Sequence, residues 1–187
     1  SLSIASGRVS FVLGLHGPCA SFETACSSSL VACHSAARAL QHGECDSHVV
    51  AGVNLMLTQG VGIGMAIAGM TSTVGRCHTF DSRADGFCRG EGCSAAVVGI
   101  GNAENGGRTV LRGSAVRQDG RSASLTAPSG QAQQGLLRAA MHEACLEAPA
   151  IALNEAHGTG TPLGDPIEVG AFAAAVLAQQ WSGDALV

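Results

Sequence analysis

The chain of 187 residues contains no lysine, and its ten basic side chains are all arginine. Charged residues make up only 13% of the sequence, and the formal net charge is −4. No run of basic residues offsets that negative charge, so the composition argues against binding to a nucleic acid backbone. No apolar stretch reaches the roughly 18 residues that a membrane-spanning helix needs, and a transmembrane segment is therefore not expected.

Aromatic residues are also scarce, at 3%, although hydrophobic residues reach 46% and glycine occupies 26 positions. Small side chains let helices and strands approach closely, as they do in layered α/β proteins. The first residues, SLSIASGRVSFVLGL, lack a basic n-region and have only a short apolar run, unlike a signal peptide. We expect a cytoplasmic protein that comprises one domain or a large part of one.

Eight cysteines are present, but none forms a C-x-x-C pair. That spacing argues against a structural zinc site, and the size of the chain argues against a disulfide framework. We expect no bound metal, and we expect most of these thiols to be reduced and buried as small hydrophobic side chains.

Apolar runs and helical periodicity predict strands that alternate with helices. The expected strands are 9–15, 48–57, 94–101, 109–116 and 150–156. The expected helices are 27–41, 131–148 and 165–180. Because the strands are apolar throughout, the pattern favours an α/β fold whose sheet is covered on both faces.

Two further local patterns bear on the site. Residues 69–93 show little periodicity and are long for a connection, so we expect a functional or packing loop there. In the helix that follows HGTGTPLG, Asp165 is expected at the N-cap, Pro166 at N1 and Glu168 at N3, which is a capping-box arrangement.

Cys26 lies in the stretch ETACSSSLVACHSA, directly before an expected helix. The free N–H groups and the positive end of the dipole at a helix start lower the pKa of a thiol and make it a usable nucleophile. The same N–H groups stabilise an oxyanion when the thiolate attacks a carbonyl. The alternative is a buried structural cysteine that happens to begin a helix, and the local pattern leaves both interpretations open.

His157 lies in EAHGTGTPLGD, after an expected strand and within a turn rich in glycine and threonine. Gly158 and Gly160 allow the backbone to bend sharply and to approach a ligand closely. A neutral histidine at such a strand end donates a hydrogen bond to a carbonyl or enolate oxygen. The alternative is a histidine that only bonds to its own turn, and this pattern does not separate the two.

The segments TACSSSLVA, FDSRADGFCRGEG and EAHGTGTPLGDPIE resemble the β-ketoacyl synthases, especially the ketosynthase domains of type I modular polyketide synthases. The resemblance runs in order along nearly the whole chain. It implies a thiolase-like fold of duplicated α-β-α-β-α layers, incomplete here. Residues 1–108 would belong to the N-terminal half, which carries the nucleophile, and 109–187 would be the first part of the C-terminal half.

The resemblance also implies a decarboxylative Claisen condensation. Cys26 would carry the acyl chain as a thioester, His157 would support decarboxylation and the enolate, and Thr159 and Thr161 would line the phosphopantetheine approach. No cofactor of the enzyme's own is implied, since the substrates are carried on an acyl carrier protein. A homodimer is implied for the parent protein.

The sequence departs from this family in two respects. Glu23 replaces the usual Asp, a change expected to affect packing only. Nothing matches the family's second active-site histidine or its nearby lysine, so we interpret the chain as an internal fragment that is inactive and poorly stable by itself.

Three alternatives remain: a ketosynthase of fatty-acid synthesis, a Cys–His acyltransferase or hydrolase, and a non-catalytic partner protein. Thr24 and Ser28 occupy the places of the two glycines that a hydrolase elbow needs, which counts against a hydrolase. The non-catalytic partners in this family lack the cysteine, so the presence of Cys26 counts against that alternative.

Overall fold

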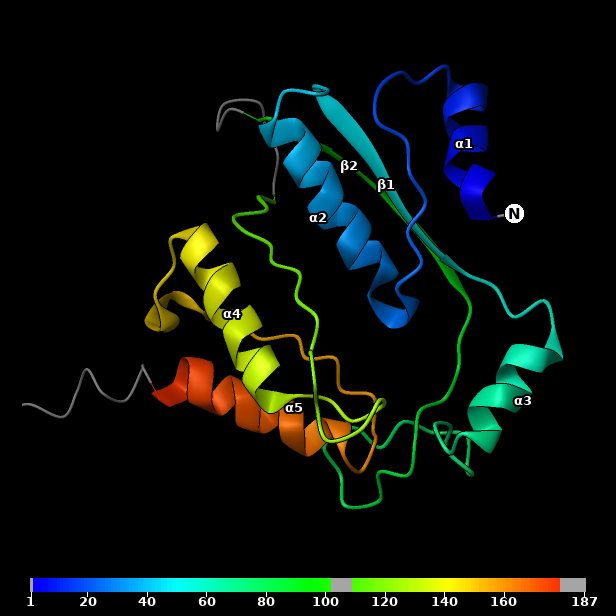
Figure 1. Ribbon diagram of the computed structural model, residues 1–187, viewed down its shortest axis with the longest axis vertical. Helices are drawn as coiled ribbons and strands as arrows, with labels where there is room; N and C mark the ends of the chain where they lie inside the picture. Colours follow the sequence, from blue (N-terminus) through cyan, green and yellow to red (C-terminus); the bar gives the residue numbers. More distant parts are fainter. Residues whose placement is uncertain (1, 102–108, 179–187) are drawn as a thin grey trace, which may run out of the picture. The chain divides into compact units, whose positions relative to one another are not determined.

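The computed structural model describes residues 2–101 and 109–178, which form two compact units. The first unit takes in the described residues of Ser1–Leu55 and Glu91–Val110, and the second those of Met56–Gly90 and Leu111–Val187. Figure 1 shows the elements along the chain.

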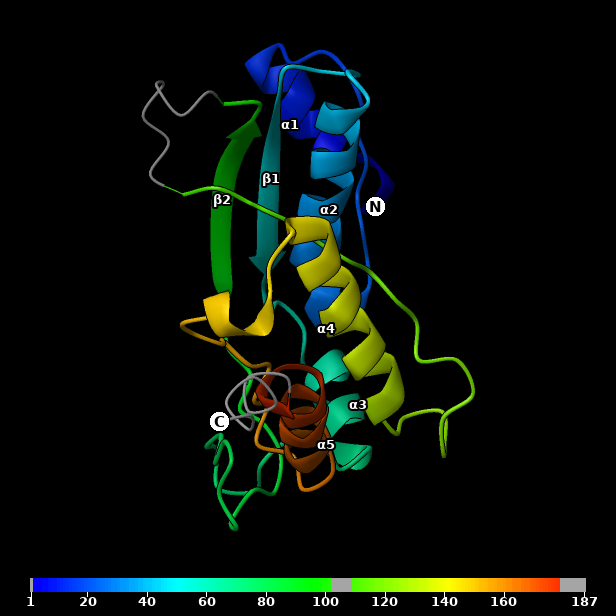
Figure 2. The same cartoon turned by 90° about the vertical axis from the view of Figure 1, so that its left-hand side faces the viewer.

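The first unit is built on the strands β1 (Ser47–Asn54) and β2 (Gly92–Gly99) and the helix α2 (Ser28–Gln41). The strands pair antiparallel, with Ser47 opposite Gly99 and Asn54 opposite Gly92. Figures 1 and 2 show α2 lying along one face of this pair. A Cβ at Gly52 of β1 would lie 3.0 Å from Ser29 Cβ, so this glycine allows the start of α2 to approach the strand closely.

The two strands overlap the predicted strands 48–57 and 94–101 and confirm them apart from their bounds, but the prediction that they are buried on both faces is wrong. Val53 is 68% exposed and Val97 is 74% exposed, because α2 covers only one face of the pair within the described residues. The buried side chains of this unit are those of Ala36, Ala39 and Leu40 on α2.

The prediction of a strand at 9–15 is also wrong, because Ala5–Leu13 forms the helix α1. Gly14 ends this helix in the left-handed conformation, at φ 63°, and its N–H donates to the carbonyl of Ser10. A short apolar run does not by itself distinguish a strand from a helix.

Two other expected strands, 109–116 and 150–156, are irregular. Neither has a neighbouring strand among the residues that the structure describes, and a strand needs such a partner for its backbone N–H and C=O groups. Leu153 is 86% exposed, which contradicts a buried strand before His157.

The second unit contains the helices α3 (Gln59–Ile67), α4 (Gly130–Ala144) and α5 (Gly164–Phe172), the last continued by a π-helical segment, Ala173–Leu177. Helix α4 confirms the helix expected at 131–148 except for its last four residues, and Ser129 Oγ caps its start by accepting a hydrogen bond of 3.2 Å from Ala132 N. Ala148, Ala175 and Val176 form the core between α4 and the π-helical segment.

All eight cysteines are free thiols, but none is buried, so the expectation of buried thiols is wrong. Five of them, Cys19, Cys45, Cys77, Cys88 and Cys145, lie outside the helices and strands, and all eight are exposed or half-buried. In the ranges 2–101 and 109–178, no helix has the length and apolar character needed to cross a membrane.

Candidate active site

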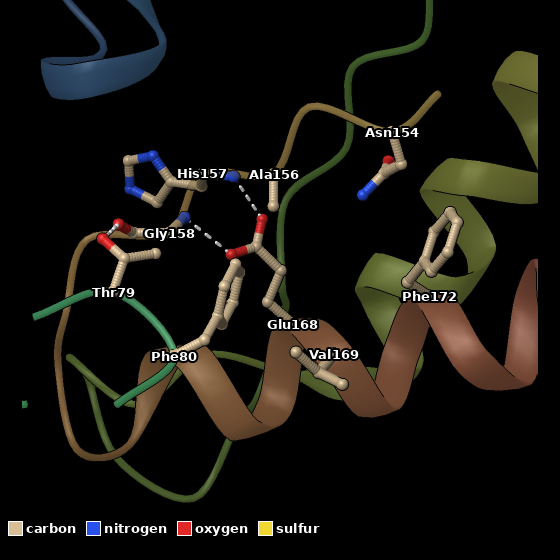
Figure 3. A pocket seen from close by; sticks show the side chains of 9 residues that line it. All are labelled: Thr79, Phe80, Asn154, Ala156, His157, Gly158, Glu168, Val169 and Phe172. Carbon is tan, nitrogen blue, oxygen red and sulfur yellow. Dashed lines mark hydrogen bonds between the residues drawn. The ribbon is translucent and has the colours of Figure 1, made fainter. Parts of the chain in front are cut away.

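His157 begins a turn, residues 157–161, that leads into α5, and we call it the histidine turn. Its first two N–H groups, those of His157 and Gly158, both donate to the carboxylate of Glu168 on α5. The bond from Gly158 N is 2.8 Å long. In Figure 3 the imidazole ring points away from this carboxylate, so the backbone is anchored while the ring stays accessible. The side chain of His157 is exposed.

Asp165 holds the other end of the histidine turn. It is 4% exposed, and its carboxylate accepts hydrogen bonds from Gly160 N at 3.1 Å and Thr161 N at 3.4 Å. Its second oxygen accepts from the N–H of Phe80 at 2.8 Å. A buried carboxylate without such donors would be strongly destabilising. Through these bonds Asp165 connects the histidine turn to the loop that contains Phe80.

The predicted capping box is therefore wrong. Helix α5 begins at Gly164, its N-cap residue Leu163 makes no side-chain capping bond, and Asp165 lies inside its first turn. The two carboxylates expected to cap α5 instead bind the N–H groups of the histidine turn, which compete for the same acceptors.

A second segment, residues 78–87 of the irregular loop, holds the other side of the turn. The hydroxyl of Thr79 donates to the carbonyl of Gly158 at 2.5 Å, and Gly86 N donates to the carbonyl of Gly160 at 3.0 Å. The prediction that this loop is a packing or functional segment agrees with these contacts.

Both glycines of the turn are required by its geometry. Gly158 has φ +52° and Gly160 has φ +74°, in the left-handed region. A Cβ at Gly158 would lie 2.7 Å from Thr79 Cγ2, and a Cβ at Gly160 would lie 2.9 Å from His78 N. The predicted sharp bend is present, and the close approach it allows is to the segment 78–80.

The histidine turn borders a pocket of about 280 Å³. Its lining residues, all drawn in Figure 3, are Thr79, Phe80, Asn154, Ala156, His157, Gly158, Glu168, Val169 and Phe172. Phe80, Ala156, Val169 and Phe172 are its apolar side chains, and Thr79, Asn154, His157 and Glu168 add polar groups, a combination typical of small-molecule pockets.

Thr159 and Thr161, the two threonines expected to bind substrate, lie beside each other in the same turn. Their hydroxyl oxygens are 3.4 Å apart, and Thr161 Oγ1 also accepts from Gly164 N at 3.1 Å. The structure thus brings His157, Thr159 and Thr161 together in the second unit.

Cys26 belongs to the first unit, in a 3-10 turn, Ala25–Ser27, that runs directly into α2. The position at a helix start agrees with the sequence-based expectation, and the thiol is exposed. Ala25 has φ 55°, an uncommon conformation for alanine.

Hydroxyl groups hold the sharp bend before Cys26. Ser27 Oγ donates to the carbonyl of Thr24 at 2.9 Å, and Ser28 Oγ donates to that of Ala25 at 2.7 Å. Ser28 Oγ also accepts from Thr24 N at 2.9 Å. The serines after Cys26 thus fix the backbone of the turn that carries the thiol.

Two carboxylates on the loop near the histidine turn have shifted pKa values. Hydrogen bonds from the Arg83 side chain and backbone hold the pKa of Asp81 well below its usual range. Hydrogen bonds from Ser72 and Thr73 lower the pKa of Asp85. Both groups are therefore ionised at neutral pH and stabilise the conformation of this loop.

The sequence analysis did not identify Thr79 and Phe80, which anchor the histidine turn. It assigned Asp165 and Glu168, the other two anchors, to a helix cap. Thr79 and Phe80 carry no local signal, since their partners lie 79 and 85 residues away along the chain. Across the described residues, no group of three His, Cys, Asp or Glu side chains is placed to bind a metal ion.

Comparisons with known proteins cover nearly the whole chain. Residues 1–100 match the family "Beta-ketoacyl synthase, N-terminal domain", and residues 108–186 match "Beta-ketoacyl synthase, C-terminal domain".

Among curated relatives, the mycocerosic acid synthase-like polyketide synthase of Mycolicibacterium smegmatis is 44% identical over 177 residues. The match covers 92% of this chain and 8% of that protein. The highly reducing polyketide synthase fogA of Aspergillus ruber is 45% identical, over 90% of this chain and 7% of its own length.

Among solved structures, the ketosynthase from module 6 of the bacillaene synthase of Bacillus subtilis aligns with a TM-score of 0.90 and 38% identity. The oxazolomycin ketosynthase domain of Streptomyces albus aligns with a TM-score of 0.90 and 36% identity. These alignments cover 96% and 94% of this chain, but 33% and 32% of the two solved chains.

Proposed function

Because the chain belongs to the β-ketoacyl synthase family, we propose that it is part of a ketosynthase that catalyses decarboxylative Claisen condensation in polyketide biosynthesis. The chain has the thiolase-like fold of ketosynthase domains, over about a third of the length of the solved examples. It spans 7% to 8% of the two polyketide synthases compared above. The reaction is therefore proposed for a larger protein that contains this chain.

We place residues 1–108 in the N-terminal half of that ketosynthase and 109–187 in the first part of its C-terminal half. The family's second active-site histidine and its lysine have no counterpart in these residues. The remaining catalytic groups would come from other parts of the protein, and the isolated chain would be inactive.

Cys26 is the proposed nucleophile. Its sulfur attacks the carbonyl of an acyl thioester on an acyl carrier protein, the acyl group moves to Cys26, and the phosphopantetheine thiolate leaves. The exposed position directly before α2 supports this role, because a helix start carries partial positive charge and backbone N–H groups that are able to stabilise an anion. The N–H of Cys26 would be one of the two oxyanion donors.

His157 is the proposed donor to the second substrate, a malonyl-type thioester. The bond to the departing CO₂ breaks, and its electron pair forms an enolate whose oxygen accepts a hydrogen bond from an imidazole nitrogen. The enolate carbon then attacks the thioester on Cys26, a carbon–carbon bond forms, and Cys26 leaves as a thiolate. The bonds from His157 and Gly158 to Glu168 support this role, because an anchored backbone presents the ring without reorganisation.

Thr159 and Thr161 are proposed to line the phosphopantetheine approach. Thr161 Oγ1 accepts a bond from Gly164 N and lies 3.4 Å from Thr159 Oγ1, so the two hydroxyls form a pair from which a substrate oxygen would accept a hydrogen bond. The protein would need no cofactor of its own, would act on an acyl carrier protein in the cytoplasm, and would form a homodimer.

The observation that carries the proposal is the anchored His157 in a chain whose two family matches together span residues 1–100 and 108–186. The test is incubation of the full-length protein that contains this chain with an acyl-carrier thioester, followed by peptide mass spectrometry. We expect the acyl group on Cys26 and CO₂ release when a malonyl carrier is added. The variant Cys26→Ala should lose acylation, whereas Cys19→Ala, which removes another exposed thiol, should retain it.

Two results would contradict the proposal. Acylation of another cysteine would remove Cys26 from the mechanism. Hydrolysis of the thioester without condensation would indicate a Cys–His hydrolase or simple acyltransferase.

A further inference from the structure

We propose that Thr79 is a positioning residue for His157, acting through its hydroxyl bond to the Gly158 carbonyl. The inference rests on the proposed function, in which His157 donates to the enolate. Thr79 itself would touch neither reacting carbon.

Thr79 supplies a kind of contact that the two carboxylates are unable to make. Glu168 and Asp165 accept hydrogen bonds from N–H groups of the histidine turn. An ionised carboxylate has no proton to give, so neither side chain can bind a carbonyl group of the turn. The hydroxyl of Thr79 donates to the carbonyl of Gly158, the residue directly after His157, at 2.5 Å.

That carbonyl needs an external anchor because of the glycine that carries it. Gly158 has φ +52° and no side chain to restrict its backbone, so its peptide group rotates more easily than that of another residue. Rotation there would move His157 relative to Thr159 and α5. The contact from Thr79 opposes this movement from the side opposite Glu168, as Figure 3 shows.

Thr79 is itself held firmly by its neighbour. Phe80 has φ 57°, uncommon for a bulky residue, and its N–H donates to the buried carboxylate of Asp165 at 2.8 Å. The ring of Phe80 lies 3.6 Å from the place that a Cβ on Gly158 would occupy. The segment that presents the Thr79 hydroxyl thus has a second anchor in Asp165, whose carboxylate also binds the far end of the turn at Gly160 and Thr161.

The test uses the full-length protein and follows two half-reactions separately. Acylation of Cys26 does not use His157 in the proposed mechanism, whereas decarboxylation of the malonyl carrier does. Thr79→Val keeps the side-chain shape and removes the donor, and Thr79→Ser keeps the donor. Thr58→Val is the matched control, since Thr58 is exposed and its side chain does not cap α3.

We expect Thr79→Val to acylate Cys26 at the wild-type rate while kcat for decarboxylation falls by about tenfold or more, because small displacements of a catalytic group cost rate steeply. KM for the malonyl carrier should stay within about twofold, the pattern of an interaction that acts in the transition state. Thr79→Ser should restore most of the decarboxylation rate, and Thr58→Val should match the wild type.

Several outcomes would overturn the inference. Wild-type decarboxylation in Thr79→Val would show that the hydroxyl is not needed. Loss of Cys26 acylation in both Thr79→Val and Thr79→Ser would indicate a general structural role, as would equally slow decarboxylation by these two variants. Failure of the proposed function would look different, because the wild-type protein itself would then neither acylate Cys26 nor decarboxylate.

Discussion

The carboxylate of Asp165 accepts a hydrogen bond of 2.8 Å from the backbone N–H of Phe80, 85 residues earlier in the chain. The same carboxylate binds Gly160 N and Thr161 N, so one buried side chain joins the irregular loop to the histidine turn. This contact determines where His157 lies relative to Thr79 and the pocket.

Asp165→Asn should destabilise the full-length protein. Asparagine has one accepting oxygen in place of two, so at least one of the three N–H groups loses its partner, at a cost of about 1–3 kcal/mol. Denaturant unfolding measures the change. Glu147→Gln, on an exposed side chain, is the control and should unfold like the wild type.

Glu168→Gln should slow decarboxylation of the malonyl carrier and leave acylation of Cys26 unchanged. The amide is neutral and has one acceptor oxygen, so of the N–H groups of His157 and Gly158 one loses its acceptor and the other keeps only an uncharged one, and the turn becomes less well ordered. Separate rates for the two half-reactions provide the measurement. Glu155→Gln, on another exposed carboxylate, should behave as the wild type, and an equal effect of both variants would contradict this role of Glu168.

Gly160→Ala should destabilise the protein by about 1–2 kcal/mol from its left-handed backbone alone, with more from the contact of the added Cβ with His78 N. Gly170→Ala is a matched control on α5, where an added Cβ meets nothing within 4 Å. It should be neutral or should stabilise the helix by up to about 1 kcal/mol. Thermal or denaturant unfolding measures the stability of both variants. Equal stability of the two would contradict the predicted strain at Gly160.

The loop 72–85 should loosen in acid. The pKa of Asp85 is lower in the folded protein than in the unfolded chain, because Ser72 and Thr73 donate to its carboxylate. Its contribution is therefore fully present above the unfolded pKa of about 3.9 and is lost as the pH falls through the folded value.

Hydrogen exchange at the N–H of Thr73, which donates to Asp85 at 3.2 Å, measures this change. After correction for the intrinsic rate, protection should decrease below about pH 4 in the wild type, as the carboxylate takes up its proton. Asp85→Asn should show weak protection at every pH. A pH-dependent loss in the variant equal to that of the wild type would assign the effect to another group.

The isolated chain should be only marginally stable. Among the described residues, the buried hydrophobic side chains are Leu40, Val176 and five alanines, whereas Phe11, Leu125 and Leu153 are largely exposed. Full burial of a large apolar side chain contributes about 1.5–3 kcal/mol, and few such side chains contribute here.

For the isolated chain we expect strong binding of a hydrophobic dye and a broad thermal transition by circular dichroism. The full-length protein is the control, and it should bind little dye and unfold cooperatively. A sharp, cooperative transition of the isolated chain would contradict this prediction.

Local patterns in the sequence were sufficient for some of the elements whose stability depends on neighbouring residues, but not for the helices α1 and α3. The helices α2 and α4 and the position of Cys26 at a helix start follow from the periodicity of the apolar residues. The sharp bend at Gly158 and Gly160 follows from their missing side chains. The thiolase-like fold and the β-ketoacyl synthase family were predicted from the resemblance of the sequence motifs to that family.

Only the tertiary structure decided which groups anchor His157. The spacing of Asp165 and Glu168 in the sequence fits a capping box. In the structure their carboxylates instead accept hydrogen bonds from N–H groups of the preceding turn. Thr79 and Phe80 reach the turn across 79 and 85 residues, and no local pattern encodes a hydrogen bond over that separation. Likewise, a strand depends on a partner elsewhere in the chain, so the apolar runs at 109–116 and 150–156 did not reveal whether they would pair.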